Sequence, residues 1–212
     1  MIPTPIAQTT YWHRSLNPKK LVEVGFSSLP KNTPMARFIK IHKVPAETSI
    51  VGLRPMEKKD VPVVTKKLNE YLKQFKFHII FNEAEVAHFL LPREWVIESW
   101  VVEDSQTDEI TDFVSFYSLP SSVLKNENHK LLNVAYSYYY FTNKHSLTDL
   151  TRDALTIAKN KGYDVFNALD ILKNTEYLQE LKFGVGDGNL HYYFYNWRVA
   201  KITPQDVGMV LV

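Results

Sequence analysis

The sequence predicts an α+β or mixed α/β fold, in which helices lie on the faces of one sheet. Segments with apolar residues at intervals of three and four alternate with segments rich in valine, isoleucine and aromatic residues. Of the 212 residues, 45% are hydrophobic and 13% are aromatic, so the chain can bury a substantial core. We expect residues 1–212 to form a single domain, with the proline-containing residues 1–10 as an extended linker.

Helix signals dominate the first half of the chain. Asn17-Pro18 is typical of an N-cap followed by proline at the first helical position, and Gly25 ends this helix. Asn82, with Glu85 in the capping-box position, begins another helix. The expected helices are 19–24, the amphipathic segment 57–75, and the segment from Asn82 to Leu90. A strand is expected over 50–55, and residues 27–45 give no clear pattern.

Strand signals dominate the second half. A polar turn at 104–108 joins the first two strands as a hairpin, and Gly162 ends a long helix. The expected strands are 95–103, 110–119, 132–142, 165–169, 192–197 and 208–211. The expected helices are 147–161 and 175–181.

The last expected strand is apolar and ends at the chain terminus. Chain ends usually fray. A strand pattern that continues to the last residue therefore predicts that this end, with its α-carboxylate, is held inside a sheet. A fixed carboxylate beside the Gly-Asp-Gly segment 186–188 and an aromatic strand would form a polar site in a hydrophobic wall.

Composition excludes several classes of function. The formal charge of +2, with acids and bases interleaved, argues against a nucleic-acid binder. There is no cysteine, and the seven histidines lack metal-ligand spacing, so we expect neither a disulfide scaffold nor a metal site. We find no signal peptide, no lipidation motif and no apolar run long enough to span a bilayer, and we expect a soluble, cytoplasmic protein.

The glycine-rich segment 183–189 does not fit a phosphate-binding loop, because no lysine follows and a strand rather than a helix comes next. Two interpretations remain. The segment is a turn that needs positive φ, with Asp187 capping its backbone, or it presents Asp187 to a cationic peptide side chain.

Two aromatic runs, 136–141 and 192–195, allow two interpretations as well. They pack on both faces of a sheet, or they line a groove for an extended peptide. His13 is a candidate base or peptide contact, although a lone histidine is more often a surface residue. No Ser-His-Asp or Cys-His arrangement is present.

The sequence resembles the eukaryotic N-myristoyltransferases (glycylpeptide N-tetradecanoyltransferases) over essentially the whole chain, and six segments carry the resemblance in this order. They are 11–21, 52–56, 71–75, 111–121, 164–170 and 182–190 with the tail to residue 212. The resemblance implies the acyl-CoA N-acyltransferase fold, a strongly bent mixed sheet flanked by helices. The family's longer chain has two acyltransferase-like halves, and this chain is similar to the C-terminal half only.

The resemblance implies transfer of a myristoyl group from myristoyl-CoA to the N-terminal glycine of proteins or peptides. The N-terminal half would bind most of the myristoyl-CoA co-substrate and supply the oxyanion donors, and no cofactor would be bound permanently. The α-carboxylate of Val212 would be the general base. Gly186, Asp187 and Gly188 would lie at the mouth of the peptide groove, with Asp187 facing a substrate lysine. The groove would be lined by Tyr11, His13, Phe26, Ser121, Tyr136, Asn167, Leu190, Tyr195 and Leu211.

Acid–base chemistry agrees with the base assignment that the resemblance implies. A glycine ammonium, with a pKa of about 7.7–8.0, must lose a proton before its nitrogen can attack a thioester. An α-carboxylate, with a pKa of about 3.3–3.7, is a weak base in water, and burial would raise that pKa. The alternatives are a peptide-binding fragment without turnover, and an acetyl-CoA-dependent N-acetyltransferase. The latter ranks lower because no glycine-rich pyrophosphate loop precedes a helix.

Overall fold

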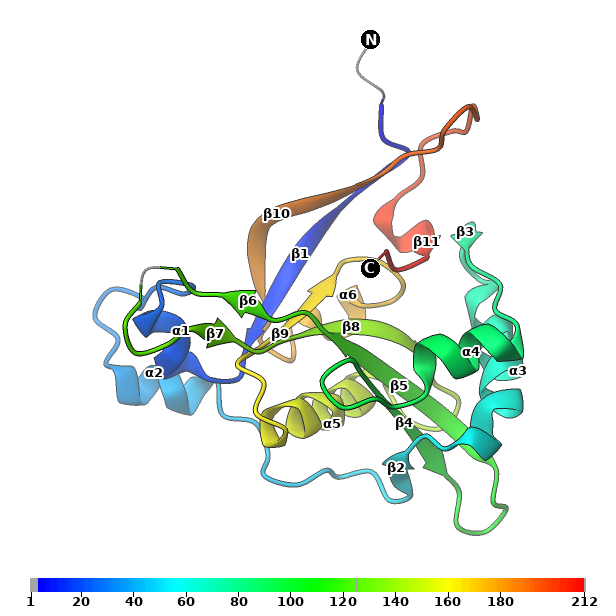
Figure 1. Cartoon of the computed structure of the whole chain (residues 1–212), viewed down its shortest axis with the longest axis horizontal. Coiled ribbons are helices and arrows are strands. Elements are labelled where there is room, and N and C mark those ends of the chain that lie inside the picture. The colour runs from blue at the N-terminus through cyan, green and yellow to red at the C-terminus, as the bar shows by residue number, and fades with distance from the viewer. Residues whose placement is uncertain (1–3, 125, 212) are drawn as a thin grey trace.

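The computed structural model describes residues 4–124 and 126–211. A seven-stranded sheet in the order β10-β1-β9-β8-β5-β4-β2 forms its centre (Figure 1). Strands β8 and β9 are parallel and all other neighbours in this sheet are antiparallel, so the mixed sheet of the predicted fold class is confirmed. The strands of this sheet are β1 (Ala7–Ser15), β2 (Leu53–Pro55), β4 (Ile97–Glu103), β5 (Ile110–Ser118), β8 (Val134–Phe141), β9 (Val165–Leu169) and β10 (Gly184–Tyr192).

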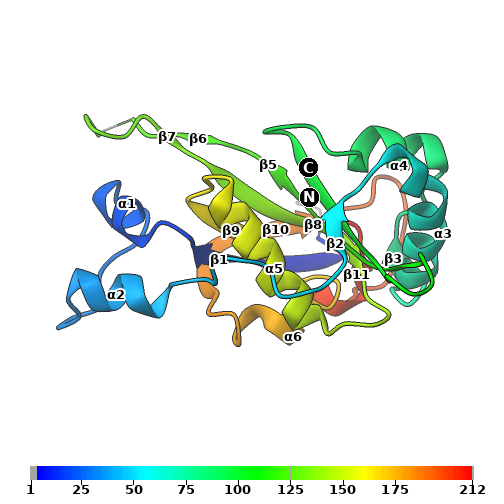
Figure 2. The same ribbon diagram turned by 90° about the horizontal axis from the view of Figure 1, so that it is seen from below.

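Helices cover both faces of the sheet. Helices α3 and α4 pack against β4, β5 and β8, and α5 packs against β5 from the other side. Figure 2 shows α5 crossing the sheet, with α1 and α2 near one end and α3 and α4 near the other. The helices are α1 (Pro18–Glu23), α2 (Met35–Ile41), α3 (Val61–Leu72), α4 (Glu83–Leu90), α5 (Leu147–Asn160) and α6 (Thr175–Leu178), with 3-10 turns η1 (Lys58–Asp60) and η2 (Pro204–Asp206).

Two short sheets complete the fold. Strand β3 (Phe77–His78) pairs in parallel with β11 (Val207–Gly208), and β6 (Ser121–Ser122) pairs antiparallel with β7 (Leu131–Leu132). Strands β1 and β10 rise together from the rest of the sheet, and the C-terminal end lies between this pair and β3 (Figure 1).

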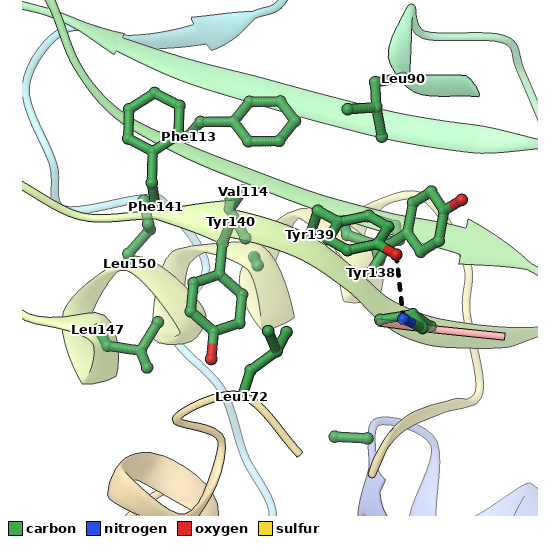
Figure 3. Close-up of a cluster of buried hydrophobic side chains, with 14 of the residues drawn as sticks. Leu90, Phe113, Val114, Tyr138, Tyr139, Tyr140, Phe141, Leu147, Leu150 and Leu172 are labelled. Atoms are coloured by element: carbon green, nitrogen blue, oxygen red, sulfur yellow. Dashed lines mark hydrogen bonds between the residues drawn. The ribbon is translucent and has the colours of Figure 1, made fainter. Parts of the chain in front are cut away.

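The core consists of aromatic and aliphatic side chains on both sides of β8. Figure 3 shows Phe113 and Phe141 on the side of Leu90 from α4, whereas Val114 and Tyr140 lie on the side of the α5 leucines. The rings of Phe113 and Phe141 stack with centroids 5.7 Å apart. Apolar side chains on the two faces of the sheet belong to one continuous core.

Local signals predicted most helix ends correctly. The Asn82 side chain accepts a hydrogen bond from the Glu85 amide at 2.9 Å, and the Glu85 carboxylate accepts one from the Asn82 amide at 2.8 Å. Gly162, with φ of 88°, follows the end of α5. Asn17 precedes α1 as predicted but does not cap it, because its side-chain amide donates to Asp164 instead, at 2.9 Å.

Three sequence expectations were wrong, and each concerns a strand. Residues 7–10, expected as linker, begin β1, which pairs on both edges with β9 and β10. The expected strand 192–197 is a strand only at Tyr192, and the glycine-rich segment before it is the strand itself. The expected strand 208–211 keeps this conformation only at Gly208, within β11. Helix α2 lies in the segment 27–45, which gave no pattern.

Asp112 fixes the turn between β8 and α5. Its side chain is fully buried and accepts hydrogen bonds from the backbone amides of Asn143, Lys144 and His145 at 2.9–3.2 Å. The Thr111 hydroxyl and the His145 ring donate to its other oxygen. Burial alone would raise the pKa of the Asp112 carboxyl, but the hydrogen bonds from these groups outweigh it, and the pKa lies below its ordinary value.

We predict that Asp112→Asn lowers the free energy of unfolding at pH 7 by about 1–3 kcal/mol, because an amide cannot accept all of these bonds. The pKa is lowered in the folded state, so the stabilisation by the carboxylate is present above the unfolded pKa of about 3.9 and is lost as pH falls below it. Urea denaturation at several pH values measures the difference, with exposed Glu109→Gln as control. Equal stability of Asp112→Asn and wild type at pH 7 would contradict this account.

Candidate functional site

Four polar or aromatic residues lie side by side across the sheet. In the strand register His13 on β1 is opposite Asn167 on β9, Asn167 is opposite Tyr136 on β8, and Tyr136 is opposite Tyr117 on β5. Residues directly opposite one another point to the same face of a sheet. These four side chains therefore form one line, which we call the site row.

The site row faces away from α5. Phe116, the neighbour of Tyr117, packs its ring against Phe166 with centroids 5.4 Å apart. Consecutive side chains point to opposite faces of a strand, so Phe116 shares the α5 face with Val114 (Figure 3). Tyr117 and the rest of the site row consequently lie on the other face.

His13 is held on three sides. Its Nδ1 atom lies 2.6 Å from the Asn167 side-chain oxygen, and this oxygen only accepts, so Nδ1 carries the proton. The ring of Phe26 packs edge-on against the imidazole, with centroids 5.4 Å apart. A Cβ atom at Gly186 would lie 2.4 Å from His13 Nε2 and 2.9 Å from the Tyr11 carbonyl oxygen. Gly186 is therefore required because no side chain fits there.

The glycine-rich segment is a bulged edge strand and not a turn. Thr10 pairs with Asn189 and Trp12 with Val185, so residues 186–188 bulge out opposite Tyr11. None of the three glycines from 184 to 188 has positive φ, so the prediction of a turn capped by Asp187 was wrong. The Asp187 side chain is exposed on this bulge.

An unbroken line of tyrosine rings extends from the site row. Tyr11 packs against Tyr136 (6.4 Å between centroids), Tyr136 stacks on Tyr117 (5.2 Å), and Tyr117 packs against Tyr138 (5.4 Å). Tyr138 in turn contacts Tyr139, at 4.6 Å. We call these five residues the tyrosine wall. A tyrosine hydroxyl, with an ordinary pKa of about 10, is protonated at neutral pH and can donate a hydrogen bond. Burial raises the pKa of Tyr11, Tyr117 and Tyr138 above this value.

The C-terminal segment, residues 207–211, lies at the far end of this wall. Val207 and Gly208 pair with β3, and the Val207 carbonyl accepts a hydrogen bond from the Leu172 amide at 2.9 Å. A Cβ atom at Gly208 would lie 2.8 Å from the Phe75 ring, so the backbone packs directly on this side chain.

Beyond β11 two tyrosine hydroxyls replace strand pairing. Tyr192 donates to the Met209 carbonyl at 2.8 Å. The Val210 amide donates to the Tyr139 hydroxyl at 3.0 Å, and Figure 3 shows this bond as the dashed line at Tyr139. The C-terminal segment is therefore fixed through residue 210, although not by the extended sheet that the sequence predicted.

The structure brings most of the predicted site residues together. Tyr11, His13, Tyr136, Asn167, Gly186 and Gly188 form the site row and its border. Phe26 shares with Ser121 a hollow of about 500 Å³. Leu190 is half-buried on β10, and Leu211 is 41% exposed. Tyr195 is 95% exposed beyond the end of β10, and Val212 lies outside the described residues.

The sequence did not single out Tyr117, Tyr139 or Tyr192 individually. The aromatic runs around Tyr136 and Tyr192 gave a signal for the last two, but Tyr117 joins the site row only through cross-strand pairing. Within residues 4–124 and 126–211, no three histidine, cysteine or acidic side chains are placed to hold a metal ion. In the same part of the chain no helix has the length and apolarity needed to cross a membrane.

We predict that Gly186→Ala displaces the His13 ring, because the new methyl group would overlap Nε2, whereas Gly184→Ala has open space around its Cβ. NMR signals of the His13 imidazole nitrogens report the change. They should shift strongly in Gly186→Ala and stay at the wild-type positions in Gly184→Ala. Unchanged signals in both variants would mean that β10 does not approach the ring this closely.

Comparison with known proteins identifies the family. The model of the C-terminal domain of myristoyl-CoA:protein N-myristoyltransferase matches residues 23–210. The chain is 51% identical over 213 residues to glycylpeptide N-tetradecanoyltransferase 1 of Arabidopsis thaliana, covering 100% of this chain and 49% of the relative. It is 51% identical over 211 residues to glycylpeptide N-tetradecanoyltransferase 2 of Bos taurus, covering 100% of this chain and 42% of the relative.

The structure also superposes closely on a solved structure. Saccharomyces cerevisiae N-myristoyltransferase with bound myristoyl-CoA superposes with a TM-score of 0.95 at 36% identity, over 100% of this chain and 56% of that chain. The chain thus spans about half the length of the curated relatives it matches. It belongs to the N-myristoyltransferase family and corresponds to its C-terminal domain.

Proposed function

We propose that this chain is the peptide-binding and base-bearing part of an enzyme that transfers a myristoyl group from myristoyl-CoA to the N-terminal glycine of proteins. Membership of the family supports the reaction class. The observation that carries the proposal for this chain is the tyrosine wall, which runs from the site row to the fixed C-terminal segment. A peptide bound along it would lie with one end at residues 209–211.

The site row has the chemistry of an extended-peptide site. The tyrosine rings provide apolar area, and their protonated hydroxyls are donors for peptide carbonyl oxygens. Asn167 is 4% exposed and is held in place by His13, so it is rigid before any peptide binds. The hollow between Phe26 and Ser121 would take side chains further along the peptide, and Leu190 and Leu211 would line its borders. Tyr195 would contact only a peptide that extends beyond the wall.

The chemical step needs a base at the peptide amine. In the proposed reaction the carboxylate of Val212 accepts a proton from the glycine ammonium, directly or through one water. The neutral nitrogen then attacks the thioester carbonyl carbon of myristoyl-CoA, and the new C–N bond forms. The C–S bond breaks, and the nitrogen gives up its next proton as the departing sulfur takes one, which leaves the amide and coenzyme A as the free thiol. The acyl-CoA site and the oxyanion donors are assigned to an N-terminal half, which is the proposed partner of this chain within one longer polypeptide.

We predict that one glycine added after Val212 abolishes most turnover when this chain is assayed behind an acyl-CoA-binding half of the family. The extension turns the Val212 carboxylate into an amide and places the new carboxylate about 3.3 Å further along the chain. Loss of a general base costs about 10²–10⁴-fold in kcat. Single-turnover and steady-state rates with a glycine-initiated peptide measure the effect.

The matched control is Val212→Leu, which keeps the carboxylate in place and should keep kcat. Myristoyl-CoA affinity should be the same in both variants, because that site is assigned to the other half. Wild-type turnover by the extended chain would show that the base is elsewhere. Peptide binding without turnover in the unextended longer chain would favour the alternative of a binding module.

We predict that Asp187→Asn weakens the binding of peptides that have a lysine beyond the first few positions. The binding of peptides with a neutral residue there should stay unaffected. The side chain is exposed on the β10 bulge, so the ion pair would contribute only about 0–1 kcal/mol, or up to about fivefold in KM. Parallel KM measurements with the two peptides test it. An equal loss for both peptides would mean that Asp187 acts only on the shape of the bulge.

A further inference from the structure

We infer that Tyr139, Tyr192 and Ser115 are positioning residues, which orient the C-terminal segment and thereby place the terminal carboxylate at the peptide amine. This inference rests on the proposed function of Val212. It assigns a role to three buried side chains that lie on β5, β8 and β10 and outside the site row. Tyr139 belongs to the tyrosine wall, but it is only 1% exposed, so its hydroxyl is turned to the C-terminal segment and not to a bound peptide.

One peptide group is held from both sides. The carbonyl of Met209 and the amide of Val210 belong to the same peptide bond and, in a trans peptide, point in opposite directions. Tyr192 donates to the carbonyl at 2.8 Å, and Tyr139 accepts from the amide at 3.0 Å. The two hydroxyls come from different strands, so together they fix the plane of this peptide group as well as its position.

A bulge in β8 aims Tyr139 at this peptide group. Val114 pairs with Tyr140 and Phe116 with Ser137, so the single residue Ser115 faces both Tyr138 and Tyr139. Bulges redirect side chains that would otherwise follow the alternation of the strand. Tyr138 and Tyr139 accordingly have neighbouring rings (Figure 3), and Tyr139 is only 1% exposed.

Ser115 holds the bulge in this form. Its hydroxyl donates to the Tyr139 carbonyl at 2.7 Å and accepts from the Tyr139 amide at 3.1 Å. A bulge leaves backbone groups outside the strand ladder, and a buried group without a partner is costly. One serine hydroxyl satisfies both groups, so the direction of the Tyr139 side chain depends on it.

The peptide group between residues 209 and 210 is close enough to the chain end to control where the terminal carboxylate lies. Two residues follow Val210, and each extends the chain by at most about 3.3–3.6 Å. A general base must lie within about 2.6–3.2 Å of the group it deprotonates, or one water away. Rotation of the 209–210 peptide group would therefore move the carboxylate out of range while the site row stays intact.

The test uses Tyr139→Phe, Tyr192→Phe and Ser115→Ala in the longer chain that contains the acyl-CoA-binding half. Each should lower kcat by about tenfold or more and leave the peptide KM within about twofold, because the site row is unchanged. The control is Tyr140→Phe. Tyr140 is the next residue on β8, and its buried hydroxyl bonds to Lys173 and Asn174 on the opposite face. That variant should lose stability but not kcat.

A double-variant comparison separates this inference from the proposed function. If Tyr139 acts through the carboxylate, Tyr139→Phe combined with the one-residue extension should be no slower than the extension alone. Full activity of the extension alone would overturn the proposed base. An inactive extension with normal kcat in all three positioning variants would overturn only the inference, as would additive losses in the double variant.

Hydrogen exchange gives a readout that does not depend on turnover. The Val210 amide should exchange faster in Tyr139→Phe and in Ser115→Ala than in wild type, and the Tyr140→Phe control should exchange like wild type. If Tyr139→Phe does not fold, Tyr192→Phe carries the kinetic test, because it leaves only a carbonyl without its partner. Slow exchange of Val210 in every folded variant would contradict the positioning role.

Discussion

The register of β1 between β9 and β10 is the constraint on which the site depends. A slip of one residue would replace His13 on the open face by Trp12 or Arg14. Hydrogen bonds on both faces prevent this. His13 bonds to Asn167 on one side, and on the other the buried Arg14 guanidinium donates to the carbonyls of Leu181, Ser15 and His42. The site row and the closely packed β10 bulge follow from this single alignment.

The site unites segments from opposite ends of the chain. Residues 7–15 form its centre, residues 184–192 form its edge, and the C-terminal segment 207–211 closes it. The tyrosine wall connects these parts through side chains of β5 and β8, which are central strands of the sheet. Such a site is rigid only when the whole sheet is folded. It can therefore fix a backbone end that would otherwise fray, as the bonds to Met209 and Val210 indicate.

Sequence patterns predicted the helices well because their signals are local, as the Asn82–Glu85 capping box and Gly162 illustrate. Sequence patterns failed where contacts between segments far apart in the chain determine the local structure. Strand β1 carries polar and aromatic residues although it is paired on both edges, and glycine at 186 reflects a lack of space rather than a need for positive φ. The candidate site residues came from the family resemblance. Tyr117 and Ser115 were missed, because cross-strand pairing and a bulge give them their positions.

The central claim is that the open face of the sheet binds the peptide with its amine at the chain terminus. A crystal structure of the longer chain with a glycine-initiated peptide and a non-reactive acyl-CoA analogue tests it most directly. The account predicts that the peptide crosses His13, Asn167 and Tyr136, with its N-terminal nitrogen within hydrogen-bond reach of the Val212 carboxylate. A peptide bound on the α5 face, or with its amine in the hollow beside Phe26 and Ser121, would contradict it.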